Sequence, residues 1–328
     1  MRRRIVVTGA AGYIGSVLVR QLLARGDEVL GLDRLLFGDH GVRDLAGEAG
    51  FRLVEADLRF PETYAGVLRG ADAIVHLAAI VGDPACSREP ELARETNLVA
   101  SSRLLEEASR AGVERFVFAS TCSNYGRFED VEHCTEDTPL NPLSLYARTK
   151  VEFEQRLLKP GRPGLIPTCL RFSTAYGPSP RMRFDLTVNE FTRDVALERP
   201  LEIYGRQFWR PYCHTTDLAR ACVQVLEADH ETVAYRVFNV GATAENYRKQ
   251  DLADILLELR PEADIRFVHK EEDPRDYKVS FARIARELAF ETTVTVSEGI
   301  AELFRLLAAG SFPSPCSDRY CNLPGPAS

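Results

Sequence analysis

The sequence predicts an α/β fold of the Rossmann type: a doubly wound parallel sheet with a smaller C-terminal substrate-binding region. Over the first two-thirds of the 328 residues, short apolar runs alternate with longer amphipathic segments. This alternation is typical of a parallel sheet with helices on both faces. A glycine-rich segment joins the first apolar run to the first amphipathic segment, which is the place of a phosphate-binding turn in such folds.

The elements follow one another in a regular order. Strands are predicted at residues 5–8, 28–33, 52–55, 73–76, 115–120 and 168–172. Amphipathic helices are predicted at 17–25, 91–111 and 146–158. Beyond a Pro- and Arg-rich loop that starts at Pro178, we expect a helix at 186–198, a strand at 201–204 and helices near 217–227 and 249–259.

These elements suggest a division of the chain. We assign residues 1–177 to a dinucleotide-binding domain, with a segment near 205–240 that returns to it. Residues 178–311 form mainly a substrate-binding cap. Residues 312–328 are rich in Pro, Ser and Cys and are expected to form a loose tail.

Composition narrows the class of protein. Apolar residues make up 45% and charged residues 27%, which suits a globular protein. The net charge of -7 argues against a nucleic-acid partner. No apolar run is long enough to span a membrane, and the cysteines look like reduced core residues, so we expect a cytoplasmic protein. Cys316 and Cys321 have no second ligand pair nearby, and we expect no metal site.

The glycine-rich segment predicts a dinucleotide site. Gly9, Gly12 and Gly15 have the spacing G-x-x-G-x-x-G between the first strand and the first helix. Such glycines allow a tight turn, a close approach of the backbone to a pyrophosphate, and close packing of helix on strand. Tyr13 and Ile14, within the same turn, are expected to lie beside the cofactor.

Asp33 ends the second strand and indicates which cofactor is preferred. A carboxylate there accepts hydrogen bonds from both ribose hydroxyls of NAD and repels the 2′-phosphate of NADP. Arg34 follows and could accommodate a phosphate, but we favour NAD. Further cofactor contacts are expected where the third and fourth strands end, at Asp57, Leu58, Leu77, Ala78 and Ala79.

Tyr146 and Lys150 are the candidate catalytic pair. Their spacing places both on one face of a helix. A nearby ammonium favours the phenolate, so the tyrosine can remove a hydroxyl proton while a hydride leaves for NAD. The same lysine can reach the nicotinamide ribose. Alone, this spacing is more often an exposed helix face, but here it follows a complete dinucleotide pattern.

Together these motifs resemble the extended short-chain dehydrogenase/reductase family. The similarity spans about residues 4–305 and is strongest to the nucleotide-sugar epimerases and dehydratases, such as UDP-galactose 4-epimerase. It rests on the glycines, the Tyr-x-x-x-Lys pair and the segment from Ala119 to Gly126, in the family's order. The resemblance implies that Thr121 is the catalytic hydroxyl and that Asn97 lies beside the cofactor. It also implies a homodimer, in which the helices predicted at 91–111 and 146–158 pair with those of the second copy.

The resemblance also implies a nucleotide-diphosphate sugar as substrate. The segment from Arg171 to Pro178 is similar to the family's R-[FY]-x-N-x-Y-G-P, with Thr174 in place of the asparagine that often contacts the diphosphate. Asn189 is a candidate for the next contact. Arg210 stands where the family's arginine pairs with the diphosphate, and Arg275 could add a second such pair. The alternative for each arginine is a surface ion pair.

The residues after Thr121 bear on the reaction. In the family, 4,6-dehydratases carry Asp and Glu there, whereas this chain has Cys122 and Ser123. We therefore expect an epimerase that oxidises the sugar transiently at C4, with Ser123 on the substrate side. A packed Cys122 is one interpretation. A thiol that exchanges a substrate proton, as in a 4,6- or 5,6-dehydratase, is another. A decarboxylase, a keto-reductase or a non-catalytic NAD sensor are further alternatives.

Overall fold

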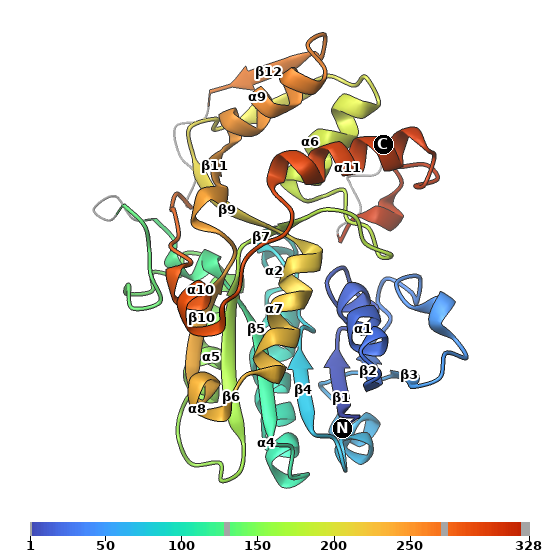
Figure 1. The fold of residues 1–328 in the computed structure, drawn as a ribbon, viewed down its shortest axis with the longest axis vertical. Helices are drawn as coiled ribbons and strands as arrows, with labels where there is room; N and C mark the ends of the chain where they lie inside the picture. The colour runs from blue at the N-terminus through green and yellow to red at the C-terminus, as the bar shows by residue number, and fades with distance from the viewer. Residues whose placement is uncertain (1, 128–131, 270–274, 323–328) are drawn as a thin grey trace.

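The computed structural model describes residues 2–127, 132–269 and 275–322. Its centre is a parallel sheet of seven strands in the order β10-β6-β5-β4-β1-β2-β3 (Figure 1). The strands are β1 (Arg4–Thr8), β2 (Glu28–Asp33), β3 (Phe51–Glu55), β4 (Ala73–His76), β5 (Arg115–Thr121), β6 (Ile166–Phe172) and β10 (Arg236–Val240). The predicted doubly wound parallel sheet is confirmed.

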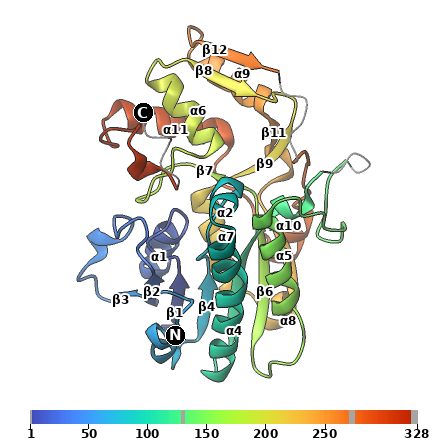
Figure 2. The ribbon, with the colours of Figure 1, turned by 180° about the vertical axis from the view of Figure 1, so that it is seen from behind.

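Helices cover both faces of this sheet because successive side chains of each buried strand point to opposite faces. In β1, Ile5 and Val7 belong to the core under α1 (Gly15–Ala24) and α7 (Thr215–Glu227). Val6 belongs to the core under α4 (Ser101–Arg110) and α5 (Leu145–Leu157). Figures 1 and 2 show these two layers from opposite sides.

The helix predicted at 91–111 is present as an unbroken helical stretch, but its middle is π-helical. It consists of α3 (Pro90–Arg94), a π-helical segment (Glu95–Ala100) and α4, with α2 (Asp83–Arg88) before them. On the opposite face, near β10, α8 (His230–Val233) and α10 (Ala282–Leu288) pack on the same core as α1 and α7. A π-helical turn shifts the register of the side chains that follow it.

The second part of the molecule lies beyond the carboxyl ends of the sheet strands (Figure 1). It contains a three-stranded sheet, β11-β9-β7, and a parallel pair, β12-β8. The elements are β7 (Thr174–Tyr176), α6 (Thr187–Ala196), β8 (Leu201–Tyr204), β9 (Trp209–His214), β11 (Asn246–Arg248), α9 (Lys249–Leu259), β12 (Ile265–Val268) and α11 (Val296–Ala308). Their apolar side chains form a separate core between α6, α9 and α11.

The expected loose tail is wrong for residues 312–322. Tyr320 is buried, and its ring packs with those of Phe184 and Phe312. The backbone N–H of Phe184 donates to the carbonyl oxygen of Tyr320 at 2.8 Å. Burial of aromatic rings stabilises this segment on the cap in spite of its Pro- and Ser-rich composition. Residues 323–328 of the predicted tail lie outside the described part of the chain.

Among the described residues, no helix combines the length and the apolar character needed to cross a bilayer.

Candidate active site

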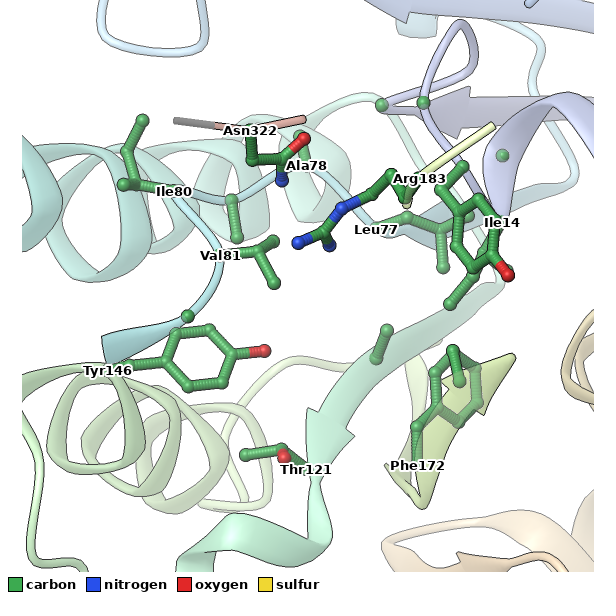
Figure 3. A pocket seen from close by; sticks show the side chains of 18 of the residues that line it. Ile14, Leu77, Ala78, Ile80, Val81, Thr121, Tyr146, Phe172, Arg183 and Asn322 are labelled. Carbon is green, nitrogen blue, oxygen red and sulfur yellow. The ribbon is translucent and has the colours of Figure 1, made fainter. Parts of the chain in front are cut away.

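A cavity of roughly 350 Å³ opens between the carboxyl ends of the sheet strands and the cap. Ligands of open α/β sheets bind at this edge. Most of the residues predicted to form the site line it together: Gly9, Gly12, Tyr13, Ile14, Gly15, Asp33, Arg34, Asp57, Leu58, Leu77, Ala78, Ala79, Thr121, Ser123, Tyr146, Lys150, Thr174 and Arg275. Figure 3 shows Ile14 at one side of the cavity and Tyr146 with Thr121 at the other.

The glycine turn is tightly packed against its own chain. A Cβ at Gly9, where φ is +72°, would lie 2.9 Å from the backbone nitrogen of Ala78. A Cβ at Gly15 would lie 2.0 Å from the carbonyl oxygen of Gly9. Both positions therefore exclude any larger residue. Within the described residues, the N–H groups of Tyr13 and Ile14 donate to no protein oxygen, and α1 begins without a side-chain cap. This turn fits a phosphate group.

Asp33 lies at the end of β2, on the cavity wall. Its Oδ2 accepts the N–H of Ala11 at 3.0 Å, and its Oδ1 accepts that of Leu35 at 2.8 Å. Burial raises the pKa of Asp33, and these backbone donors oppose the rise. Asp57 is held between Arg59, at 2.6 Å, and Arg34, at 3.8 Å. Both carboxylates are thus held in place on the cavity wall.

Tyr146 and Lys150 lie on the cavity side of α5. Lys150 Nζ is 5.8 Å from the centre of the Tyr146 ring and donates to the carbonyl oxygen of Ala119 at 2.8 Å. Burial lowers the pKa of Lys150 to about 8. Burial, with smaller contributions from Cys86 and Asp83, raises the pKa of Tyr146. Burial thus favours the protonated phenol, and a cation close to the ring acts in the opposite direction.

Thr121 is the last residue of β5, and Cys122 and Ser123 follow it. Their side chains do not all face the cavity. Thr121 and Ser123 line the cavity. The Thr121 hydroxyl oxygen accepts the N–H of Ser123 at 3.1 Å, which leaves its proton for a ligand. Cys122 is 1% exposed, is not part of the cavity wall, and its Sγ contacts the carbonyl oxygen of Arg171 at 3.2 Å. Burial raises the pKa of this thiol well above its usual range.

Four predicted site residues are therefore not on the cavity wall: Asn97, Cys122, Asn189 and Arg210. Asn97 supports the wall from behind, since its side chain accepts from and donates to the backbone of Ile80 at 2.8 and 2.9 Å. Asn189 accepts the N–H of Gly177 and donates to the Tyr13 hydroxyl, both at 2.9 Å. The Arg210 guanidinium lies over the Tyr277 ring. Asn97 and Asn189 thus hold neighbouring residues in place, and the expected ligand contacts of these side chains stay predictions.

The cavity also contains polar residues that the sequence did not indicate as ligands: Asp83, Arg181, Arg183, Tyr277 and Asn322. Asp83 pairs with Arg275 at 3.3 Å, and its Oδ1 is buried without a hydrogen-bond partner in the described chain. From the sequence, Arg181 and Arg183 were predicted only to belong to a loop after Gly177. No sequence signal indicated Asn322, because it comes from the expected tail.

No group of three or more His, Cys, Asp or Glu residues suited to a metal ion is found in the described ranges. Cys316 is exposed and accepts a hydrogen bond from Arg199 at 2.6 Å, and Cys321 is a free thiol.

Comparison with known proteins agrees with this architecture. The model of the NAD dependent epimerase/dehydratase family matches residues 5–241. The dTDP-glucose 4,6-dehydratase of Streptomyces griseus is 32% identical over 92% of this chain and 93% of its own. UDP-glucuronic acid decarboxylase 1 of Arabidopsis thaliana is 28% identical over 92% of this chain and 69% of its own. The solved UDP-glucose 4-epimerase of Thermus thermophilus, in complex with NAD, is 29% identical and superposes with a TM-score of 0.80 over 92% of this chain and 98% of that one. The chain belongs to the NAD dependent epimerase/dehydratase family.

Proposed function

We propose that this protein is an NAD-dependent nucleotide-sugar epimerase that acts through transient oxidation at sugar C4. One observation carries the proposal: a single cavity joins a phosphate-binding glycine turn to Tyr146, Lys150 and Thr121. NAD, when bound, supplies a positively charged nicotinamide ring that accepts a hydride from carbon and returns it. Asp33 favours NAD over NADP because its carboxylate would meet the 2′-phosphate of NADP.

The residues of the chain move the proton of this reaction. Tyr146 is proposed to take the proton of the C4 hydroxyl when a hydride leaves C4, and to return it after the sugar has turned over. Thr121 is proposed to donate a hydrogen bond to the same oxygen. Lys150 is held by the Ala119 carbonyl at 2.8 Å, which fixes its ammonium near the phenol. A cation there favours the phenolate, opposing the effect of burial.

The absence of a carboxylate at positions 122 and 123 favours epimerisation over 4,6-dehydration. Cys122 packs away from the cavity, so it does not support a dehydratase mechanism that uses a thiol. Dehydration nevertheless stays the second candidate, because Asp83 brings a carboxylate to the cavity from α2. A non-catalytic sensor is less favoured, since Tyr146 and Lys150 both line the cavity.

Arg275 and Thr174 are the proposed contacts for the nucleotide-diphosphate sugar, with Ser123 beside the sugar. The Ser123 hydroxyl lies 3.4 Å from that of Tyr277. A cytoplasmic location also belongs to this proposal, and fractionation of the source cells tests it.

Replacement of Tyr146 tests the catalytic assignment. We expect Tyr146→Phe to lower kcat at least about a hundredfold with every sugar nucleotide that the wild type converts, because the proton has no acceptor. NAD should still bind. Tyr204→Phe, on the exposed side of β8, is the matched control and should keep full turnover. Turnover unchanged in Tyr146→Phe would contradict the catalytic assignment, and turnover absent from the wild type would favour the sensor.

A further inference from the structure

Residues 312–322, called here the C-terminal segment, are fastened to the loop between β7 and α6. The rings of Phe184 and Tyr320 lie 5.5 Å apart, and both are buried. The N–H of Phe184 donates to the carbonyl oxygen of Tyr320 at 2.8 Å. Arg181 Nη2 donates to the carbonyl oxygen of Cys321 at 3.2 Å. Apolar and polar contacts therefore fix the same short stretch.

The end of this segment reaches the cavity and orients an arginine there. The N–H of Asn322 donates to Oδ2 of Asp185 at 3.1 Å. The same carboxylate accepts Nε and Nη2 of Arg183 at 3.0 and 2.8 Å. One edge of the guanidinium is thus occupied by Asp185, while Arg183 and Asn322 both line the cavity. Figure 3 shows their polar ends pointing into it, on the same side as Ala78 and Ile14.

The charges of the cavity wall favour an anionic ligand. Five described cations line it, namely Arg34, Lys150, Arg181, Arg183 and Arg275, against three described carboxylates, namely Asp33, Asp57 and Asp83. Asp57 pairs with Arg34 and Asp83 with Arg275. Arg183 is paired with Asp185, which lies outside this wall, so its guanidinium offers the cavity its remaining N–H donors while much of its charge is neutralised. A guanidinium edge and a side-chain amide are donors that suit phosphate oxygens.

We propose that Arg183 and Asn322 bind the diphosphate of a nucleotide ligand, and that the C-terminal segment holds them in position through Asp185 and Tyr320. This inference rests on the proposed function, because that function supplies two diphosphates, one in the cofactor and one in the substrate. Arg183 lies between Ile14 of the glycine turn and Tyr146 (Figure 3). A binding measurement distinguishes the diphosphate of the cofactor from that of the substrate.

The experiment measures dissociation constants by calorimetry for the full-length chain. The probes are ADP-ribose for the cofactor, the tightest binder among UDP, dTDP, GDP and CDP for the substrate, and the matching nucleoside, which has no phosphate. Arg183→Gln is expected to weaken at least one diphosphate probe about tenfold or more and to leave the nucleoside unchanged. Asn322→Ala should weaken the same probe. Arg266→Gln, which breaks an exposed pair with Asp264 on β12, is the matched control.

Which probe is weakened identifies the source of the diphosphate, and either result supports the proposal. Tyr320→Ala should weaken that probe as well, because it releases the segment that carries Asn322 without replacing a residue of the cavity wall. Should both diphosphate probes bind equally well to Arg183→Gln and Asn322→Ala, the inference fails while the proposed function stands. If Arg183→Gln does not fold, Asn322→Ala decides alone. Equal loss of nucleoside binding would overturn the inference. A wild type that binds neither diphosphate would overturn both proposals.

Discussion

Thr121 and Cys122 are neighbours in the chain, yet only Thr121 faces the cavity. The extended backbone at Thr121 and the short 3-10 turn that begins at Cys122 direct the two side chains apart. The thiol ends against the Arg171 carbonyl of β6. This packed position is the simpler of the two interpretations that the sequence allowed.

Cys122→Ala is therefore expected to keep full turnover. The small cavity that it leaves should lower the free energy of unfolding by about 1 kcal/mol, so kcat is compared well below the melting temperature. Thr121→Ala, one residue away, should lower kcat about tenfold or more, because the oxygen at C4 loses a hydrogen bond. A large loss of kcat in Cys122→Ala, with Thr121→Ala unaffected, would reverse the two assignments.

Lys150, a proposed catalytic residue, is expected to lower the stability of the folded protein because its ammonium group is buried. Its pKa is about 8 in the folded protein and near 10.5 in the unfolded chain. Below pH 8 both states hold the proton, and the folded state bears the full cost of burying the ammonium. Between pH 8 and about 10.5 the folded state loses the proton first, so this cost disappears as the pH rises.

We expect Lys150→Met to raise the free energy of unfolding at pH 7 by about 1–3 kcal/mol, since it removes a buried charge while keeping most of the side-chain volume. The gain should shrink towards pH 10, and kcat should fall. Thermal unfolding at both pH values measures this. A variant that is less stable at pH 7, or whose gain grows with pH, contradicts the account.

At the scale of elements, the six predicted strands agree with β1 to β6 to within two residues at each end, because buried parallel strands are short apolar runs between helices. The π-helical segment within the helix predicted at 91–111 was not predicted. Residues 95–100 have no Pro or Gly, so nothing in the sequence marks the π-helical turn. This turn contains Asn97, which holds Ile80 on the cavity wall.

The helices α4 and α5 are the expected dimer interface, and this stays a prediction. Their apolar side chains point mainly inwards, and Arg156 on α5 donates to Ser102 on α4 at 3.1 Å. Such a polar surface would form a hydrogen-bonded interface rather than an apolar one. Light scattering after size-exclusion chromatography should give twice the chain mass at micromolar protein. The mass of a single chain would refute the dimer.

The sequence predicted the parts of the cavity wall that come from short local motifs better than the parts that come from distant segments. The glycine turn, Asp33 and the Tyr146–Lys150 pair are local patterns, and each lies on the cavity wall as predicted. The rest of the cavity wall depends on segments that meet only in the fold. Asp83, Arg183 and Asn322 come from α2, the loop before α6 and the C-terminal segment, and no spacing in the sequence connects them.

The central claim is that the protein inverts C4 of a nucleotide sugar through oxidation and return of the same hydride. The most direct test uses UDP-, dTDP-, GDP- and CDP-sugars with deuterium at C4, followed by mass spectrometry and NMR of the products. The account predicts a product of unchanged mass, inverted at C4, with the deuterium still on that carbon and no net reduced cofactor. Loss of water or of carbon dioxide, or deuterium at any position other than C4, would contradict it.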